Sequence, residues 1–150
     1  MSDFTIPYVH PLVVHFPIAL LSVSAVALVG WLVRDRLKWL VVAFWLQAAG
    51  LLGAVAAVLS GTVLKHDIEG EPMVEILGQT HEEFGEWTAW MAAVLLVAIS
   101  GSIIWHRLSV RRPGVPAPWR LAVAVLGLAV AGLALWTGHI GGTMVWGVPR

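Results

Sequence analysis

The chain has no cysteine and few charged residues. Without cysteine it can form no disulfide, thiolate metal site, iron–sulfur cluster, cysteine nucleophile or c-type haem attachment. Charged residues make up only 12% of the 150 residues, and hydrophobic residues make up 59%. An ordinary soluble domain carries about a quarter charged residues. The deficit therefore excludes a water-soluble globule and a disordered chain, and a net charge of zero gives no attraction to nucleic acid.

Long hydrophobic runs, in contrast, are abundant. A membrane-spanning helix needs about 20 mostly apolar residues. Four stretches meet this condition, at residues 11–33, 39–64, 84–106 and 119–138. Backbone groups cannot stay unpaired in lipid, so we expect an all-α membrane protein whose four transmembrane helices form one antiparallel bundle over residues 1–150. A capping-box pair, Thr80 and Glu83, predicts that the third helix begins near His81.

The charges are divided unevenly between the two ends of this bundle. Seven of the nine basic residues lie in the loops after spans one and three, whereas eight of the nine acidic residues lie toward the opposite ends. Because basic loops stay in the cytoplasm, both termini should face outward. Eight tryptophans near the ends of the spans predict two interfacial belts. The inner belt holds Trp31, Trp39, Trp105 and Trp119, and the outer belt holds Trp87, Trp90, Trp136 and Trp146.

Spans two and four share a pattern of small residues at a constant offset of 77 positions. Gly50, Ala54, Ala57, Ser60 and Gly61 match Gly127, Ala131, Ala134, Thr137 and Gly138. Small residues let helices pack closely in lipid, which is the simpler interpretation, and they would also allow a homodimer. They would equally leave room for a flat cofactor inside the bundle. The order of helix, basic loop and small-residue helix occurs twice, which indicates a duplicated helical hairpin.

Five of the six histidines gather at the outer ends of the predicted helices. They are His10, His15, His66, His81 and His139, whereas His106 lies at the inner end. His15 is the most informative, because it lies about a turn inside an apolar span, where an ionisable ring is a functional-site hypothesis. Pro17 lacks a backbone N–H and should disturb the helix beside it.

Imidazole side chains at one end of a bundle indicate a cofactor or metal site. Haem iron needs two imidazoles from facing helices, and a zinc or copper ion needs three or four histidine and carboxylate ligands. His15, His81 and His139 could serve either purpose, with His10 or Glu82 as a further ligand. The histidines could also only hydrogen-bond across helix ends, and their spacing does not separate these three interpretations.

The segment His-Pro-Leu-Val-Val-His-Phe-Pro at residues 10–17 resembles the signature of an uncharacterised bacterial membrane family, domain of unknown function 2231. Residues 137–147 are similar to that family's second signature, a glycine-flanked histidine followed by a hydrophobic pair and an aromatic residue. His81 also matches, and the resemblance covers essentially the whole chain as a four-span unit. It implies the fold but no established activity. Similar members are joined to Rieske-type or cytochrome c-type domains, which implies redox chemistry at the outer face and favours haem over a small ion.

Together these features predict a multi-pass protein of the bacterial inner membrane that binds b-type haem near its outer, periplasmic face. His15 with His81 or His139 would supply the axial ligands, and His10 is a further candidate. The protein would be an electron carrier rather than a catalyst, acting between a quinone or membrane dehydrogenase and a separate c-type cytochrome or Rieske-type protein. The alternative is a non-redox accessory or scaffold protein whose histidines and acids bind zinc or copper, or are purely structural.

Overall fold

A computed structural model describes residues 9–67, 72–108 and 114–147 as a bundle of α-helices. The helices are α1 (Val9–Val13), α2 (His15–Arg34), α3 (Leu37–Asp67), α4 (Pro72–Leu108) and α5 (Ala117–Trp146). Four helical segments are long and apolar enough to cross a membrane, and these described ranges contain no strand. The predicted all-α fold with four membrane-spanning helices is confirmed.

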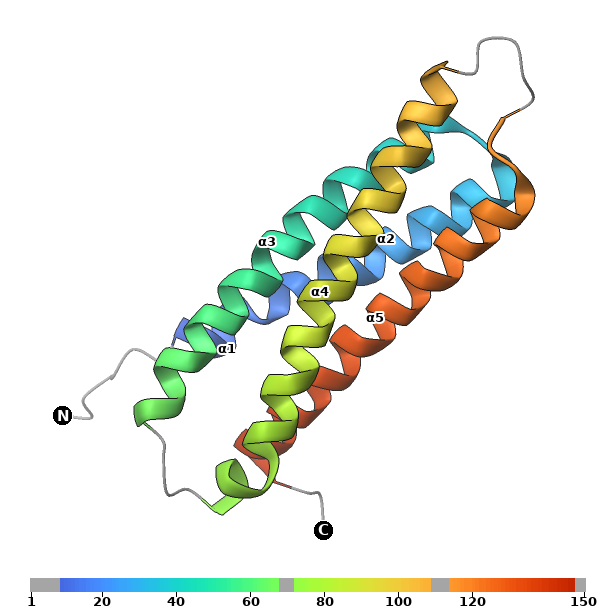
Figure 1. The fold of residues 1–150 in the computed structure, drawn as a ribbon. Coiled ribbons are helices and arrows are strands. Elements are labelled where there is room, and N and C mark those ends of the chain that lie inside the picture. Colours follow the sequence, from blue (N-terminus) through green and yellow to red (C-terminus); the bar gives the residue numbers. More distant parts are fainter. Residues whose placement is uncertain (1–8, 68–71, 109–113, 148–150) are drawn as a thin grey trace, which may run out of the picture.

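The four long helices run side by side in alternating directions (Figure 1). Helix α2 packs against α3 and α5, and α4 packs against the same two helices, so the four form a closed ring. Short helix α1 lies against α3. The end of the bundle that holds α1, the last turns of α3 and α5 and the first turns of α4 is called the histidine end below. The connection between α2 and α3 lies at the opposite end.

The first apolar segment is interrupted between α1 and α2. Pro17 has no N–H to donate, and its ring crowds the carbonyl four residues earlier, so a regular helix cannot run through this point. The Pro17 ring is buried against α3, where a Cβ atom added to Gly53 would lie 3.1 Å from Pro17 Cδ. The disturbance predicted beside Pro17 agrees with the break between α1 and α2 at Val14.

Helix α4 begins much earlier than the sequence predicts. It starts at Pro72, so the prediction of a helix start near His81 is wrong. Proline suits the first turn of a helix, where its missing N–H is not needed. Glu83 does not cap the helix; its carboxylate accepts a hydrogen bond of 3.1 Å from Gln79 Nε2, one turn earlier. His81 therefore lies about two and a half turns inside a continuous helix, which fixes the direction of its side chain.

Asp35 closes the connection at the end opposite the histidine end. It adopts the left-handed conformation, with φ of 44°, and its N–H donates to the Trp31 carbonyl at 2.8 Å. Its carboxylate forms an ion pair of 3.3 Å with Arg120 at the start of α5. Asp35 thus ends α2 and ties it to α5.

The repeated small residues of α3 and α5 receive side chains from α2. A Cβ atom on Gly50 would lie 2.7 Å from Leu21 Cδ2, and one on Gly127 would lie 2.6 Å from Leu28 Cδ1. Both leucines are buried, at 1% and 0% exposure. At these two positions the close-packing interpretation of the repeat is confirmed, because leucine side chains fill the space that the glycines leave.

Replacing Gly127 with leucine should lower the free energy of unfolding by about 1–3 kcal/mol, because the new side chain overpacks the contact with Leu28. The matched control is Gly132→Leu on the same helix, where an added Cβ meets no atom within 4 Å. Unfolding in detergent micelles, followed by far-ultraviolet circular dichroism, measures both variants. Equal stability of the two variants would contradict this packing.

Six of the eight predicted belt tryptophans are exposed, whereas Trp39 is partly buried against the core and Trp31 is fully buried. The exposed members are Trp87, Trp90, Trp105, Trp119, Trp136 and Trp146. Trp31 is instead fully buried in the core, at 0% exposure, because the α2–α3 turn folds it inward. Exposed indole rings at both ends of the bundle suit the membrane–water interfaces.

Candidate functional site

The histidine end brings His10 and His81 together, although 70 residues separate them in the sequence. His10 comes from α1 and His81 from α4. Their ring centroids lie 6.1 Å apart, and the ring planes are nearly perpendicular, at 89°. Both side chains are partly buried.

The His10 ring is held by the last turns of α3. Its Nδ1 atom lies 3.0 Å from Ser60 Oγ. The Ser60 hydroxyl donates its own hydrogen to the Ala57 carbonyl at 3.0 Å. A hydroxyl has one hydrogen to give, so His10 must donate from Nδ1–H and Ser60 Oγ accepts. The neutral ring then carries a lone pair on Nε2.

The His81 ring is held in the same way by α5. Its Nδ1 atom lies 3.1 Å from the backbone carbonyl oxygen of Thr137. A carbonyl oxygen can only accept, so His81 donates from Nδ1–H and keeps a lone pair on Nε2. Metal-ligating histidines are commonly fixed by this kind of bond from the other ring nitrogen. Both members of the pair therefore have the tautomer that a metal ligand requires.

Glycine lies beside each ring where a larger residue would collide with it. A Cβ atom on Gly61 would lie 3.1 Å from His10 Cε1, and one on Gly141 would lie 2.9 Å from His81 Cε1. Both distances are shorter than an ordinary van der Waals contact. The two rings can therefore occupy these positions only because α3 and α5 carry glycine there.

The two halves of the chain contribute to the pair in parallel. Ser60 and Thr137, which hold the two rings, are the matching positions of the repeat. In each half a helix carries a histidine, and the following small-residue helix accepts the hydrogen bond from its Nδ1. The glycines depart from the repeat, because Gly61 corresponds to Gly138 whereas the glycine beside His81 is Gly141.

A sequence model that describes its family as a predicted membrane protein, DUF2231, matches residues 6–148. The chain belongs to the DUF2231 family. This confirms the resemblance stated from the His-Pro signature, while the family's description assigns no activity. Neither a curated protein nor a solved structure matches the chain.

Two other predicted ligands of this DUF2231 protein lie outside the pair. The His15 side chain is exposed, and its Nδ1 donates to the Pro11 carbonyl at 2.6 Å. The His139 side chain is also exposed, and its ring packs against Trp136 with centroids 5.7 Å apart. Each of these rings contacts its own segment. Their assignment as ligands stays a prediction, to which the structure adds no contact with His10 or His81.

The described part of this DUF2231 protein holds no group of three or more histidine, aspartate or glutamate side chains placed to bind a metal ion. The predicted ligand Glu82 neighbours His81 on α4. Several outer residues lie beyond the described part, among them Asp3, Glu69, Glu71 and the side chains of His66 and Asp67. A zinc or copper site therefore stays a prediction.

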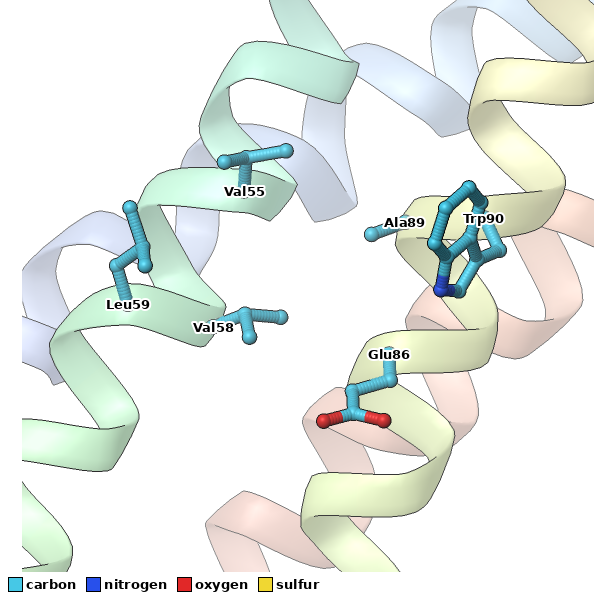
Figure 2. A pocket seen from close by; sticks show the side chains of 6 residues that line it. All are labelled: Val55, Val58, Leu59, Glu86, Ala89 and Trp90. Carbon is cyan, nitrogen blue, oxygen red and sulfur yellow. The ribbon is translucent and has the colours of Figure 1, made fainter.

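A groove lies between α3 and α4, next to the histidine pair. Its volume is about 320 Å³. Figure 2 shows Val55, Val58 and Leu59 on the α3 side and Glu86, Ala89 and Trp90 on the α4 side, with the Glu86 carboxylate extending into the gap. The groove begins directly before Ser60 on α3 and five residues after His81 on α4.

Sequence reasoning missed the roles of Ser60, Thr137, Gly61 and Gly141. All four lie in recognised patterns: Ser60, Gly61 and Thr137 belong to the repeat, where they were interpreted as packing residues, and Gly141 belongs to the second signature. The signal that could have identified Ser60 and Thr137 is their equivalence. Ser60 and Thr137 are separated by the offset of the repeat, and each lies toward the end of its predicted span. His10 and His81 lie near the start of the predicted spans one and three, which precede them.

Proposed function

We propose that this DUF2231 protein binds a b-type haem through His10 and His81 and carries electrons at the outer face of a bacterial inner membrane. The observation that carries the proposal is the paired arrangement of the two rings. Both have Nδ1 engaged as a donor, both keep Nε2 for a ligand bond, and their centroids lie 6.1 Å apart.

This separation suits one iron atom with two axial imidazoles. Half of the 6.1 Å between the centroids is about 3 Å, and His10 and His81 would hold the iron from their two helices. A metal–imidazole bond of about 2 Å, added to the distance from the ring nitrogen to the ring centre, gives a similar value. Gly61 and Gly141 keep bulk away from both rings.

The ligand count favours haem over a small ion. Haem brings four nitrogens of its own and asks the protein for two axial ligands. A zinc or copper ion held by the protein alone needs three or four. The described residues bring two histidines together, which is the number that haem requires from the protein. His10 thus replaces His15 as the preferred partner of His81 in the proposal.

The charge of the histidine end supports an external electron partner. Acidic residues Glu75, Glu82 and Glu83 lie on the first turns of α4. Such a surface attracts a basic protein and speeds their encounter. We propose a separate c-type cytochrome or Rieske-type protein as this partner, with both termini of the chain on the same, periplasmic side.

Elemental analysis of the protein purified from membranes tests the proposal against its alternatives. The proposal predicts iron, extractable as haem, in stoichiometric amount with protein. Stoichiometric zinc or copper would instead favour the metal-binding accessory protein. A protein free of metal and unable to take up added haem would favour a purely structural role for the histidines.

Replacing Ser60 with alanine should weaken haem binding by about 10–100-fold, because Ser60 orients the His10 ring from outside the ligand shell. Thr62→Ala is the control, since the exposed Thr62 hydroxyl only donates to the Leu59 carbonyl of its own helix. Haem titration of the apoprotein, followed by absorption spectroscopy, gives the two affinities. Equal losses in both variants would show that Ser60 does not position His10.

A further inference from the structure

The groove between α3 and α4 opens sideways from the bundle. Two of its wall residues are strongly exposed, Leu59 at 63% and Trp90 at 71%. In a membrane-spanning bundle, an apolar side chain that is exposed in this way faces lipid. An occupant of the groove must therefore arrive through the bilayer, and it must be soluble in the bilayer.

Glu86 is the polar element of an otherwise apolar lining. Trp87 and Trp90, next to it on α4, belong to the outer tryptophan belt, so the carboxylate lies where hydrocarbon gives way to headgroups. Glu86 is exposed and lies among apolar groove residues, so its carboxylate is available to a ligand in the groove. A carboxylate accepts hydrogen bonds and repels phosphate. The preferred headgroup is thus an uncharged donor of hydrogen bonds, not a phospholipid.

The groove also adjoins the histidine pair. Glu86 follows His81 by five residues, which gives a rise of about 7.5 Å along α4 and a rotation of about 140° about its axis, so the two side chains leave the helix on different sides. Between them lies Gly85, where an added Cβ would be 3.9 Å from Val58 Cγ2 in the groove wall and 4.0 Å from Thr137 Cγ2. Thr137 is the residue whose carbonyl holds His81. Gly85 and Thr137 would therefore lie between a ligand in the groove and the proposed haem ligand His81.

We propose that this groove binds the headgroup of a membrane-soluble quinol. The aromatic headgroup packs against Trp90 and the apolar wall, one hydroxyl donates to the Glu86 carboxylate, and the isoprenoid tail leaves through the lateral opening into lipid. This inference deepens the proposed function and rests on it, because a quinol is the class of lipid-soluble molecule that supplies electrons to a haem. Binding itself, however, can be measured whether or not haem is present.

The test is anaerobic calorimetric titration of decylubiquinol into the full-length protein in phosphatidylcholine nanodiscs, prepared with and without haem. Glu86→Ala should raise the Kd at least about tenfold, since a hydrogen bond to a charged group is lost. Glu83→Ala, an exposed carboxylate three residues earlier, is the matched control and should leave the Kd unchanged. The dimethyl ether of the same quinol, which has no hydroxyl donor, should bind the wild type as weakly as the quinol binds Glu86→Ala.

Three results would overturn the proposal. If the quinol and its dimethyl ether bound the wild type with equal affinity, the groove would bind only the apolar part of the molecule and would not recognise the hydroxyl group. Equal affinities of Glu86→Ala and Glu83→Ala would remove Glu86 from the site. If the titration heats were no larger than those measured with nanodiscs that contain no protein, the quinol would only be partitioning into the lipid. Quinol binding by a protein that takes up no haem would support the groove site while contradicting the proposed function, so the two failures are distinguishable.

Discussion

Replacing His81 with alanine should lower haem affinity by more than about 100-fold. Loss of a residue that only orients a metal ligand typically costs 10–100-fold, so loss of the ligand itself should cost more. His10→Ala should have a similar effect, and the double variant should be little worse than either single variant, because both rings serve one iron. Haem titration of each apoprotein, followed by the growth of the Soret band, gives the affinities.

His15→Ala and His139→Ala are the matched controls for these two variants. Both histidines lie at the same end of the bundle, but their exposed rings contact only their own segments. Their removal should change haem affinity less than about twofold, below the 10–100-fold typical of groups that support a ligand. Strong loss of haem in either control, with affinity kept in His10→Ala, would contradict the assignment of the pair. His81→Met should retain haem and raise its reduction potential, because thioether ligation has that effect.

Gly141→Val should also weaken haem binding strongly, although it removes no ligand. A Cβ atom at this position would lie 2.9 Å from His81 Cε1, so the His81 ring must leave its place. Displacement of the ring also breaks its hydrogen bond to the Thr137 carbonyl. We expect haem affinity to fall at least about tenfold, the lower limit for loss of an outer-shell partner.

Gly142→Val, one residue further along α5, separates a local clash from a general effect of valine in the helix. An added Cβ at Gly142 meets no atom within 4 Å. This variant should bind haem like the wild type, and both variants should show the same helical circular dichroism in micelles. If Gly141→Val retained wild-type affinity, the placement of the His81 ring against α5 would be wrong.

The spanning helices were predictable because membrane insertion depends on composition and length, which a sequence shows directly. The start of α4 was not predictable, because Thr80 and Glu83 fit the capping-box pattern equally well when they lie inside a helix. There Glu83 accepts from Gln79 one turn earlier. The burial of Trp31 was likewise hidden, because a tryptophan near the end of a span fits both a belt and a core.

The histidine end itself followed from topology, but the choice of partners did not. Alternating helices necessarily place the outer histidines near one another. Which rings face each other depends on the rotation of each helix about its axis, and His10 faces Ser60 on α3. His15 was preferred because it lies deeper in the apolar run. The structure leaves its side chain exposed.

The repeat acquires a clearer meaning from the structure. In the middle of the bundle its small residues accept leucine side chains of α2, as at Gly50 and Gly127. Toward the histidine end the same two helices supply Ser60 and Thr137, the acceptors that orient His10 and His81. These two helices thus combine close packing with an acceptor for each ring, a side-chain hydroxyl at Ser60 and a backbone carbonyl at Thr137.

The most direct measurement is the absorption spectrum of the detergent-purified protein, recorded oxidised and then after reduction with dithionite. Ligation by His10 and His81 predicts a sharp Soret band, with separate alpha and beta bands on reduction, as for a b-type haem with two imidazole ligands. These bands should disappear in His81→Ala and persist in His15→Ala. A featureless spectrum of the wild type, even after incubation with haem, would contradict the account.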